Sequence, residues 1–141
     1  MRIKRSDESV SWQQVAALFQ AVGWGQRDPN AIQSAFARSS FKAFAFNGDE
    51  LVGFGRTIDD GRFYATVVDV VVHPAHQRNG VGKAIVEDLQ SRLEGFLIVT
   101  LTAAPDVQPF YGRLGWRKQT TAMIRPRSKE QARLNCADEE V

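Results

Sequence analysis

A turn with two glycines, between a valine-rich segment and an amphipathic segment, has the residue types needed to bind a phosphate group. Gly80 and Gly82 stand at the start of a predicted helix, whose first turn leaves backbone N–H groups unpaired and carries partial positive charge. Glycine lets the backbone approach a bound group closely, and Arg78 and Lys83 would add positive charge. The simpler alternative is a helix that begins with two turn glycines and binds nothing.

Two common phosphate-binding motifs do not fit this turn. A P-loop needs Gly-Lys followed by Ser or Thr, and here Gly82-Lys83 is followed by Ala84. A dinucleotide-binding fold needs the spacing G-x-G-x-x-G, whereas this sequence has G-x-G and a single β-α-β unit. His73 and His76 lie beside the turn, but their spacing is poor for a metal and no third ligand is evident, so we expect no metal site.

The elements that must position this turn follow from hydrophobic periodicity. Apolar residues recur at helical spacing from Trp12 to Val22, and Gly23 ends the pattern. Asp28 and Pro29 suit the N-cap and the first position of a second helix. From residue 41 the period changes to two, which indicates strands. The expected elements in chain order are helices at about 12–22 and 29–39, strands at 41–46, 51–58 and 63–73, a helix at about 81–93, a strand at 96–101, a helix at 106–114 and a strand at 116–124.

This order of elements predicts a single domain of the α/β (α+β) class over residues 1–125. Its centre is a mixed β-sheet with helices on both faces, and the β-α-β unit around the glycine turn makes two strands parallel. Residues 67–72 are nearly all valine, which is typical of a central strand buried on both faces. Residues 126–141 are polar and lack periodicity, so we expect them to form a poorly ordered tail.

Composition limits the partners and the compartment. The 18 basic and 16 acidic residues give a net charge of +2, which does not indicate nucleic-acid binding. No run approaches the roughly 18 apolar residues of a membrane span, and no apolar signal core follows the basic start. The single cysteine, Cys136, excludes an intrachain disulfide. We therefore expect a cytoplasmic protein with no nucleic-acid or membrane partner.

Two segments resemble the motifs of one known family. Gln77-Arg78-Asn79-Gly80-Val81-Gly82 resembles the signature Gln/Arg-x-x-Gly-x-Gly/Ala of the GNAT family of acyl-CoA N-acyltransferases. Pro109-Phe110-Tyr111-Gly112-Arg113-Leu114-Gly115-Trp116 resembles that family's Phe-Tyr-x-x-x-Gly-Phe element. The two segments lie on either side of the expected strand at 96–101, as in the family, and the resemblance covers residues 10–125.

Within the family, residues 51–56 and 68–72 look most like the plant-plastid and cyanobacterial branch that includes serotonin N-acetyltransferase-like enzymes. The resemblance implies the GNAT fold, in which acetyl-CoA lies between two splayed parallel strands, here 67–72 and 96–101. Many members carry Asn seven residues before the tyrosine, where this sequence has Ala104, so that cofactor contact would be missing or replaced. The implied cofactor-binding residues are Val70, Val71 and Val72 for the pantetheine arm, Gln77, Arg78, Asn79, Gly80, Val81, Gly82 and Lys83 for the pyrophosphate, and Phe110 beside the sulfur.

The same resemblance implies acetyl transfer to a primary amine, which needs groups that manage protons. Tyr111 would lie near the sulfur of acetyl-CoA, where its phenol can donate a proton to the departing thiolate. The backbone N–H of Val70 would stabilise the developing oxyanion. Asp69, the one titratable side chain in the valine-rich strand, is a candidate base for the amine. Strand alternation places Asp69 on the face opposite to Val68 and Val70, so a buried structural carboxylate, with water relaying the proton, is the alternative.

The acceptor site is predicted from the first two helices and the segment between them. In the GNAT fold the first two helices cover the acceptor site, so Trp24, which lies between them, is a candidate to line an apolar or aromatic pocket; otherwise it anchors the core. We expect a small amine, such as an arylalkylamine (serotonin, for example), a polyamine or an amino-acid amine, to attack directly in a ternary complex. A protein lysine is the alternative acceptor, and a non-catalytic acyl-CoA-binding or sensor domain is the alternative function. Because members of this family often form homodimers, the resemblance implies a homodimer.

Overall fold

The structure, a computed structural model, describes residues 1–138 of the chain. The chain divides into two compact units, Met1–Thr102 and a second that begins at Ala103. The first holds a β-sheet and its covering helices, and the second holds two short helices. None of the helices in residues 1–138 is long and apolar enough to cross a lipid bilayer.

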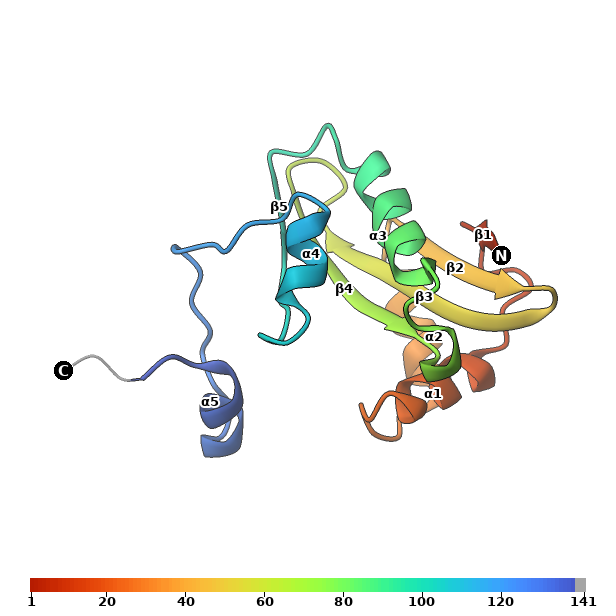
Figure 1. Cartoon of the computed structure of the whole chain (residues 1–141), viewed down its shortest axis with the longest axis horizontal. Helices are drawn as coiled ribbons and strands as arrows, with labels where there is room; N and C mark the ends of the chain where they lie inside the picture. Colours follow the sequence, from red (N-terminus) through yellow and green to blue (C-terminus); the bar gives the residue numbers. More distant parts are fainter. Residues whose placement is uncertain (139–141) are drawn as a thin grey trace. The chain divides into compact units, whose positions relative to one another are not determined.

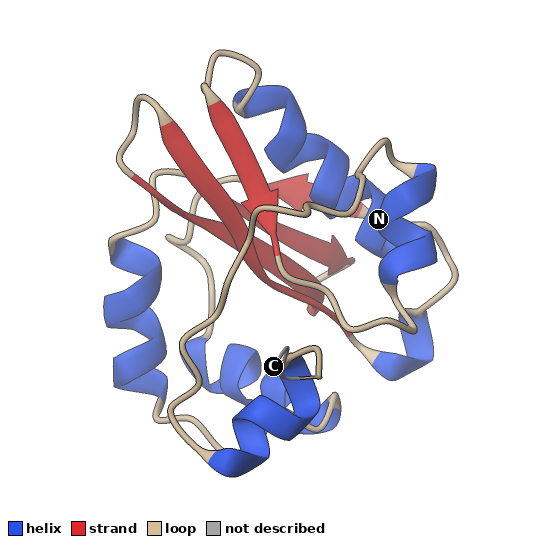
Figure 2. Ribbon diagram, turned by 90° about the vertical axis from the view of Figure 1, so that its left-hand side faces the viewer, coloured by secondary structure: helices blue, strands red, loops and turns tan. Residues whose placement is uncertain are grey.

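The first unit is built on a five-stranded sheet with the order β1-β2-β3-β4-β5 (Figure 1). The strands are β1 (Arg2–Lys4), β2 (Lys42–Asn47), β3 (Glu50–Asp59), β4 (Tyr64–Val72) and β5 (Ile98–Leu101). Neighbours from β1 to β4 run antiparallel, whereas β4 and β5 run parallel, and Figure 2 shows the twist of the sheet. The predicted mixed sheet is confirmed. Periodicity did not reveal β1, because a strand of three residues is too short to show a repeat.

Helices cover both faces of this sheet. They are α1 (Trp12–Ala21), α2 (Pro29–Ala37) and α3 (Val81–Arg92). Consecutive residues of β3 separate the two faces: Phe54 packs in the core with α1 and α2, whereas Gly53 and Gly55 face α3. A Cβ at Gly53 would lie only 3.0 Å from Ile85 Cδ1, so glycine allows α3 to pack directly on the strand.

Aromatic rings hold α1 and α2 to the sheet. The rings of Phe19 and Phe54 are 5.0 Å apart between centroids, and those of Phe36 and Phe44 are 5.7 Å apart. All four residues are at most 1% exposed, and burial of each such side chain contributes about 1.5–3 kcal/mol. The predicted N-cap of α2 is confirmed, since Asp28 accepts a hydrogen bond from the backbone of the new helix. Both helices are thereby fixed on β2 and β3.

The second unit contains α4 (Gln108–Arg113) and α5 (Lys129–Asn135). α5 lies in the segment expected to form a poorly ordered tail, and the search for periodicity did not indicate this helix. Ser128 Oγ accepts a hydrogen bond from the Gln131 N–H at 3.0 Å and caps the helix. This signal was present in the sequence as a Ser before a short helix-forming run. Residues 139–141 of the expected tail lie outside the described residues.

The predicted strand at 116–124 is not formed. These residues pair with no strand in the part of the chain that the structure describes. The physical reason lies in the pattern, because residues 117–121 are all polar and offer no apolar face that a sheet could bury. Met123 is 98% exposed, which agrees with the absence of a buried face.

Candidate active site

β4 carries a β-bulge at Asp69. Phe54 of β3 lies opposite Val71 of β4, and the next pair along is Arg56 opposite Val68. β3 therefore advances two residues while β4 advances three, which is the pattern of a bulge. Asp69 has a φ of 53°, a conformation that residues other than glycine seldom adopt. The bulge re-aims the one acidic side chain of β4.

Because of this bulge, the side chains of β4 do not alternate between the two faces of the sheet as the sequence led us to expect. Val68 lies opposite Arg56, and cross-strand partners share a face of the sheet. Arg56 Nε donates a hydrogen bond to Asp69 Oδ2 at 2.8 Å, so Asp69 and Val68 are on the same face and the expectation that they oppose one another is wrong. Val70 does lie on the other face: its Cγ2 is 3.4 Å from the place of a Cβ on Gly55, which faces α3.

Two arginines hold the Asp69 carboxylate. Besides Arg56, whose Nη1 also donates to Ser39 Oγ at 3.2 Å, Arg27 Nη1 lies 3.6 Å from Asp69 Oδ1. The side chains of Asp69 and Arg56 are 13% and 14% exposed, whereas that of Arg27 is 40% exposed. Each carboxylate oxygen therefore faces a cation. This geometry suits Asp69 to holding positive charge better than to accepting a proton.

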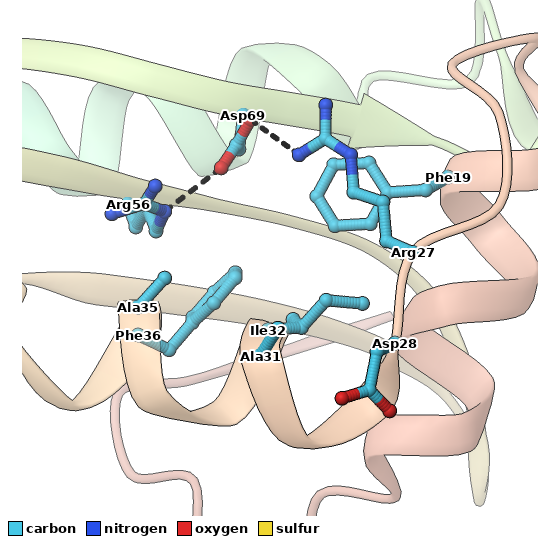
Figure 3. A pocket seen from close by; sticks show the side chains of 9 residues that line it. All are labelled: Phe19, Arg27, Asp28, Ala31, Ile32, Ala35, Phe36, Arg56 and Asp69. Atoms are coloured by element: carbon cyan, nitrogen blue, oxygen red, sulfur yellow. Dashed lines mark hydrogen bonds and ion pairs between the residues drawn. The ribbon is translucent and has the colours of Figure 1, made fainter.

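Asp69 and the two arginines close one side of a cavity of about 320 Å³ within the first unit (Figure 3). Its other walls are apolar side chains of α1 and α2. The lining residues are Phe19, Arg27, Asp28, Ala31, Ile32, Ala35, Phe36, Arg56 and Asp69. The volume is in the range of small-molecule sites, and the walls combine apolar surface with one charged end.

Sequence reasoning missed Arg27 and Arg56. Arg56 had a signal, as the one charged residue in the apolar run from residue 51 to residue 58, but Arg27 had none in a polar loop. Trp24 does not line the cavity; its ring lies 5.8 Å from Phe19, and it is 46% exposed. Its role in the acceptor site stays a prediction.

The glycine turn has the expected form. Gly80, at φ 83°, is the N-cap of α3, and no side chain caps this helix. Arg78 also has a positive φ, 68°, and both residues are exposed together with Asn79 and Lys83. Gln77 Nε2 donates to the carbonyl oxygen of Val72 at 3.1 Å and ties the turn to the end of β4. The start of α3 thus presents uncapped backbone N–H groups at an exposed turn, which suits a phosphate group.

The two parallel strands beside this turn are paired along only part of β4. β4 and β5 pair only from Tyr64 opposite Ile98 to Val67 opposite Leu101, where β5 ends. β4 continues for five more residues, including Val70, Val71 and Val72, which have no partner on the β5 side among the described strands. The edge is therefore open to amide groups of a ligand. An open edge that leads to an uncapped helix start fits the pantetheine and pyrophosphate parts of acetyl-CoA.

His73 and His76 lie between β4 and this helix start. His73 Nδ1 accepts a hydrogen bond from the Ala75 N–H at 3.0 Å, so one imidazole is used in shaping the turn. Residues 1–138 contain no group of three or more His, Cys, Asp or Glu side chains that could hold a metal ion.

Tyr111 lies on α4, in the second unit. Its ring contacts those of Phe110 and Trp116, at centroid distances of 4.9 and 6.3 Å. Burial raises the pKa of the Tyr111 phenol above its ordinary value, so the hydroxyl keeps its proton at neutral and moderately alkaline pH. A phenol that keeps its proton is in the state that a proton donor requires.

The sheet, the open edge of β4 and the glycine turn agree with a match to a known family. The family model of the acetyltransferase (GNAT) domain matches residues 7–126. This chain therefore belongs to the GNAT family and is an N-acetyltransferase of that type.

Similar proteins support this assignment. An uncharacterized N-acetyltransferase, ycf52, from Pyropia yezoensis is 34% identical over 119 residues, which cover 80% of this chain and 68% of the relative. Serotonin N-acetyltransferase 2, chloroplastic, from Oryza sativa subsp. japonica is 30% identical, covering 86% of this chain and 64% of the relative. A solved GNAT-family acetyltransferase from Streptococcus pneumoniae superposes with a TM-score of 0.75 at 26% identity, covering 90% and 98% of the two chains. The suggested branch of the family is thus represented among its relatives, while the cytoplasmic location and the homodimer stay predictions.

Proposed function

We propose that this N-acetyltransferase transfers the acetyl group of acetyl-CoA to the primary amine of a small molecule bound in the Asp69 cavity. The cavity carries this proposal, since about 320 Å³ with apolar walls suits a small amine such as an arylalkylamine. Its charged end lies at the bulge of β4, next to the open strand edge suited to acetyl-CoA. The resemblance to a serotonin N-acetyltransferase supports the same acceptor class.

The roles of the residues in the first unit follow from their positions, and the role of Tyr111, in the second unit, follows from the family resemblance. Acetyl-CoA would supply the thioester carbonyl that the amine attacks, held by the backbone of Val70, Val71 and Val72 and by the start of α3. Asp69 would hold the amino group of the acceptor, and water would carry its proton to solvent, because both oxygens of Asp69 already face guanidinium groups. The N–H of Val70, at the bulge, would stabilise negative charge that develops on the carbonyl oxygen. Tyr111 would protonate the departing thiolate.

A screen of amines tests the proposal. Purified protein is incubated with acetyl-CoA and arylalkylamines, polyamines, amino acids or a lysine peptide, and acetylated products are measured by mass spectrometry. We expect turnover with small amines that have an apolar body. Release of thiol gives a second readout, with Cys136→Ser used to remove the one protein thiol. Tight acetyl-CoA binding without acetylation of any amine would instead identify a non-catalytic acyl-CoA-binding domain.

A further inference from the structure

Arg27 and Arg56 hold Asp69 in different ways. Arg56 is fixed: it donates to Asp69 at 2.8 Å and to Ser39 at 3.2 Å, and its guanidinium lies 5.4 Å from the centre of the Phe36 ring. Arg27 is held loosely, since its closest approach to Asp69 is 3.6 Å, beyond ordinary hydrogen-bond length. The cavity therefore contains one tight ion pair and one open ion pair.

The loop that carries Arg27 leaves its guanidinium available. Gly23 and Gly25, both at positive φ, precede it between α1 and α2. The guanidinium stacks on the Phe19 ring at 4.1 Å, and its side chain is 40% exposed. A guanidinium has five N–H donors in a fixed fork, so Arg27 can bind a carboxylate while it remains stacked on Phe19.

Resting on the proposed function, we propose that the acceptor is a free α-amino acid with an apolar side chain. Its ammonium group would bind Asp69 and its carboxylate would bind Arg27, so that the zwitterion inserts into the open ion pair. The ammonium and carboxylate groups of an α-amino acid are bonded to the same carbon atom and match a carboxylate and a guanidinium that stand side by side (Figure 3). Bidentate binding between guanidinium and carboxylate adds geometric selectivity.

The charges around the cavity favour this acceptor over a polyamine. Arg27, Arg56 and Asp69 together carry one net positive charge. The other acidic lining residue, Asp28, accepts a hydrogen bond from the Asn30 N–H at 3.4 Å at the start of α2, and its carboxylate points away from Asp69 in Figure 3. A second ammonium group would therefore meet positive charge, whereas a carboxylate compensates it.

The walls favour an apolar side chain. Ala31 and Ala35 stand one turn apart on α2 and leave space between the helix and the sheet. Ile32, Phe36 and Phe19 provide the surrounding apolar surface and are at most 5% exposed. A polar or charged amino-acid side chain would lose its hydration here without gaining a partner.

Matched pairs of probes test the proposal, because decarboxylation removes only the group that Arg27 would bind. Acetylation of L-tryptophan is compared with that of tryptamine, and L-phenylalanine with phenethylamine, as ratios of kcat/KM. In Arg27→Gln we expect each amino-acid-to-amine ratio to fall roughly 10–100-fold, as for loss of a charged hydrogen bond, with partial rescue in Arg27→Lys. The control is Arg5→Gln, which removes another exposed arginine from an aspartate, Asp88, that does not line the cavity. We expect the ratios of this control to equal those of the parent.

The outcomes separate this inference from the proposed function. A parent enzyme that prefers the decarboxylated amines, or ratios that Arg27→Gln leaves unchanged, would overturn the amino-acid acceptor while leaving acetyl transfer to a small amine intact. Absence of acetylation with all four probes and every amine of the screen would overturn both. Calorimetric titration of L-tryptophan into parent and Arg27→Gln adds a readout independent of turnover, and equal affinities would contradict the inference.

Discussion

Two aspartates of this protein each lie between two arginines, but their surroundings differ. Asp88, on α3, accepts hydrogen bonds from Arg5 Nε and Nη2 at 3.1 and 2.9 Å and a third from Arg92. Asp69 has one partner at 2.8 Å and one, Arg27, at 3.6 Å, and its backbone has a φ of 53°. Exposure does not separate them, since the two aspartate side chains are 16% and 13% exposed.

The cluster at Asp88 is structural, whereas the one at Asp69 has the features of a site. At Asp88 the backbone is regular helix, each arginine is at hydrogen-bond distance, and Arg92 also donates to the Lys42 carbonyl oxygen at 2.7 Å. This cluster joins the N-terminal segment, α3 and β2. At Asp69 the backbone is strained, one guanidinium is loosely held, and a cavity adjoins the carboxylate. Strain of this kind gathers at functional sites, so charge alone does not mark a site, whereas strain beside a cavity does.

The largest expected effect concerns the other end of the helix that carries Asp88. Gly82→Asp places bulk and negative charge at the start of α3, where the pyrophosphate would bind. We expect the Kd for acetyl-CoA to rise by roughly 100-fold or more, measured by calorimetry on protein whose circular dichroism is unchanged. Asp88→Asn, on the same helix, should leave this Kd unaltered. Unchanged affinity in a folded Gly82→Asp protein would exclude the glycine turn from the donor site.

The second prediction compares the two clusters directly. Asp69→Asn and Asp88→Asn each leave two arginines without a carboxylate, and we expect each to lower the free energy of unfolding by roughly 2 kcal/mol, as for loss of a hydrogen bond to a charged group. Only Asp69→Asn should also lower kcat/KM for the amine, roughly 10–100-fold and chiefly through KM, as for loss of a charged hydrogen bond.

Steady-state kinetics at several pH values distinguish this role from general base catalysis. A base would show a fall of roughly 10²–10⁴-fold in kcat and the loss of one limb of the pH profile. Equal kinetic parameters in Asp69→Asn and Asp88→Asn would contradict the difference drawn between the clusters.

The glycine turn could be predicted from the sequence because the backbone makes it. Gly80 and Gly82 specify a turn and a helix start through local spacing, and the parallel strands on either side follow from the β-α-β order. The same reasoning located Tyr111 on a short helix. Features of this kind can be predicted without knowing which distant side chains come together in the fold.

The cavity could not be predicted, because residues distant in the sequence build it and a bulge orients it. Nothing in the run of valines indicates an extra residue at Asp69, so alternation gave the wrong relation to Val68. Arg27 becomes relevant only once α1 and α2 lie across β4. The missing strand at 116–124 is the converse case, because residues 117–121 are all polar and already show in the sequence that the segment has no face for a sheet to bury.

The third prediction concerns Tyr111, which neither arginine cluster includes. Tyr111→Phe keeps the ring and removes the proton donor, so we expect kcat to fall at least about tenfold with little change in acetyl-CoA affinity, as for an interaction made in the transition state. Single-turnover acetylation is the appropriate measurement, since product release can hide an effect on chemistry. Because burial raises the pKa of Tyr111, the parent rate should not decline from ionisation of this phenol until the pH exceeds about 10. A parent-like single-turnover rate in Tyr111→Phe would make it a packing residue.

The smallest effect is expected at Asp60, a carboxylate held by backbone groups instead of arginines. Asp60 Oδ1 accepts hydrogen bonds from the N–H groups of Arg62, Phe63 and Tyr64 at 2.9, 2.7 and 3.1 Å. These bonds favour the charged form and lower the pKa of Asp60 below its ordinary value. Its charge therefore stabilises the folded state above the unfolded pKa of about 3.9, and this contribution is lost as the pH falls through the lower folded value.

Melting temperatures of the parent, Asp60→Ala and Asp60→Asn between pH 7 and pH 2.5 test this account. The melting temperature of the parent should exceed that of Asp60→Asn by a constant amount above about pH 5. This difference should shrink as the pH falls below about 4, because asparagine offers an acceptor oxygen but does not titrate. The melting temperature of Asp60→Asn should exceed that of Asp60→Ala by an amount that does not change with pH, since neither variant has a carboxylate at this position. A parent advantage over Asp60→Asn that stays constant down to pH 2.5 would show that the turn needs the shape of the aspartate side chain and not its charge. The turn at Asp60 would then differ from both arginine clusters, because the guanidinium groups there bind the charged carboxylate.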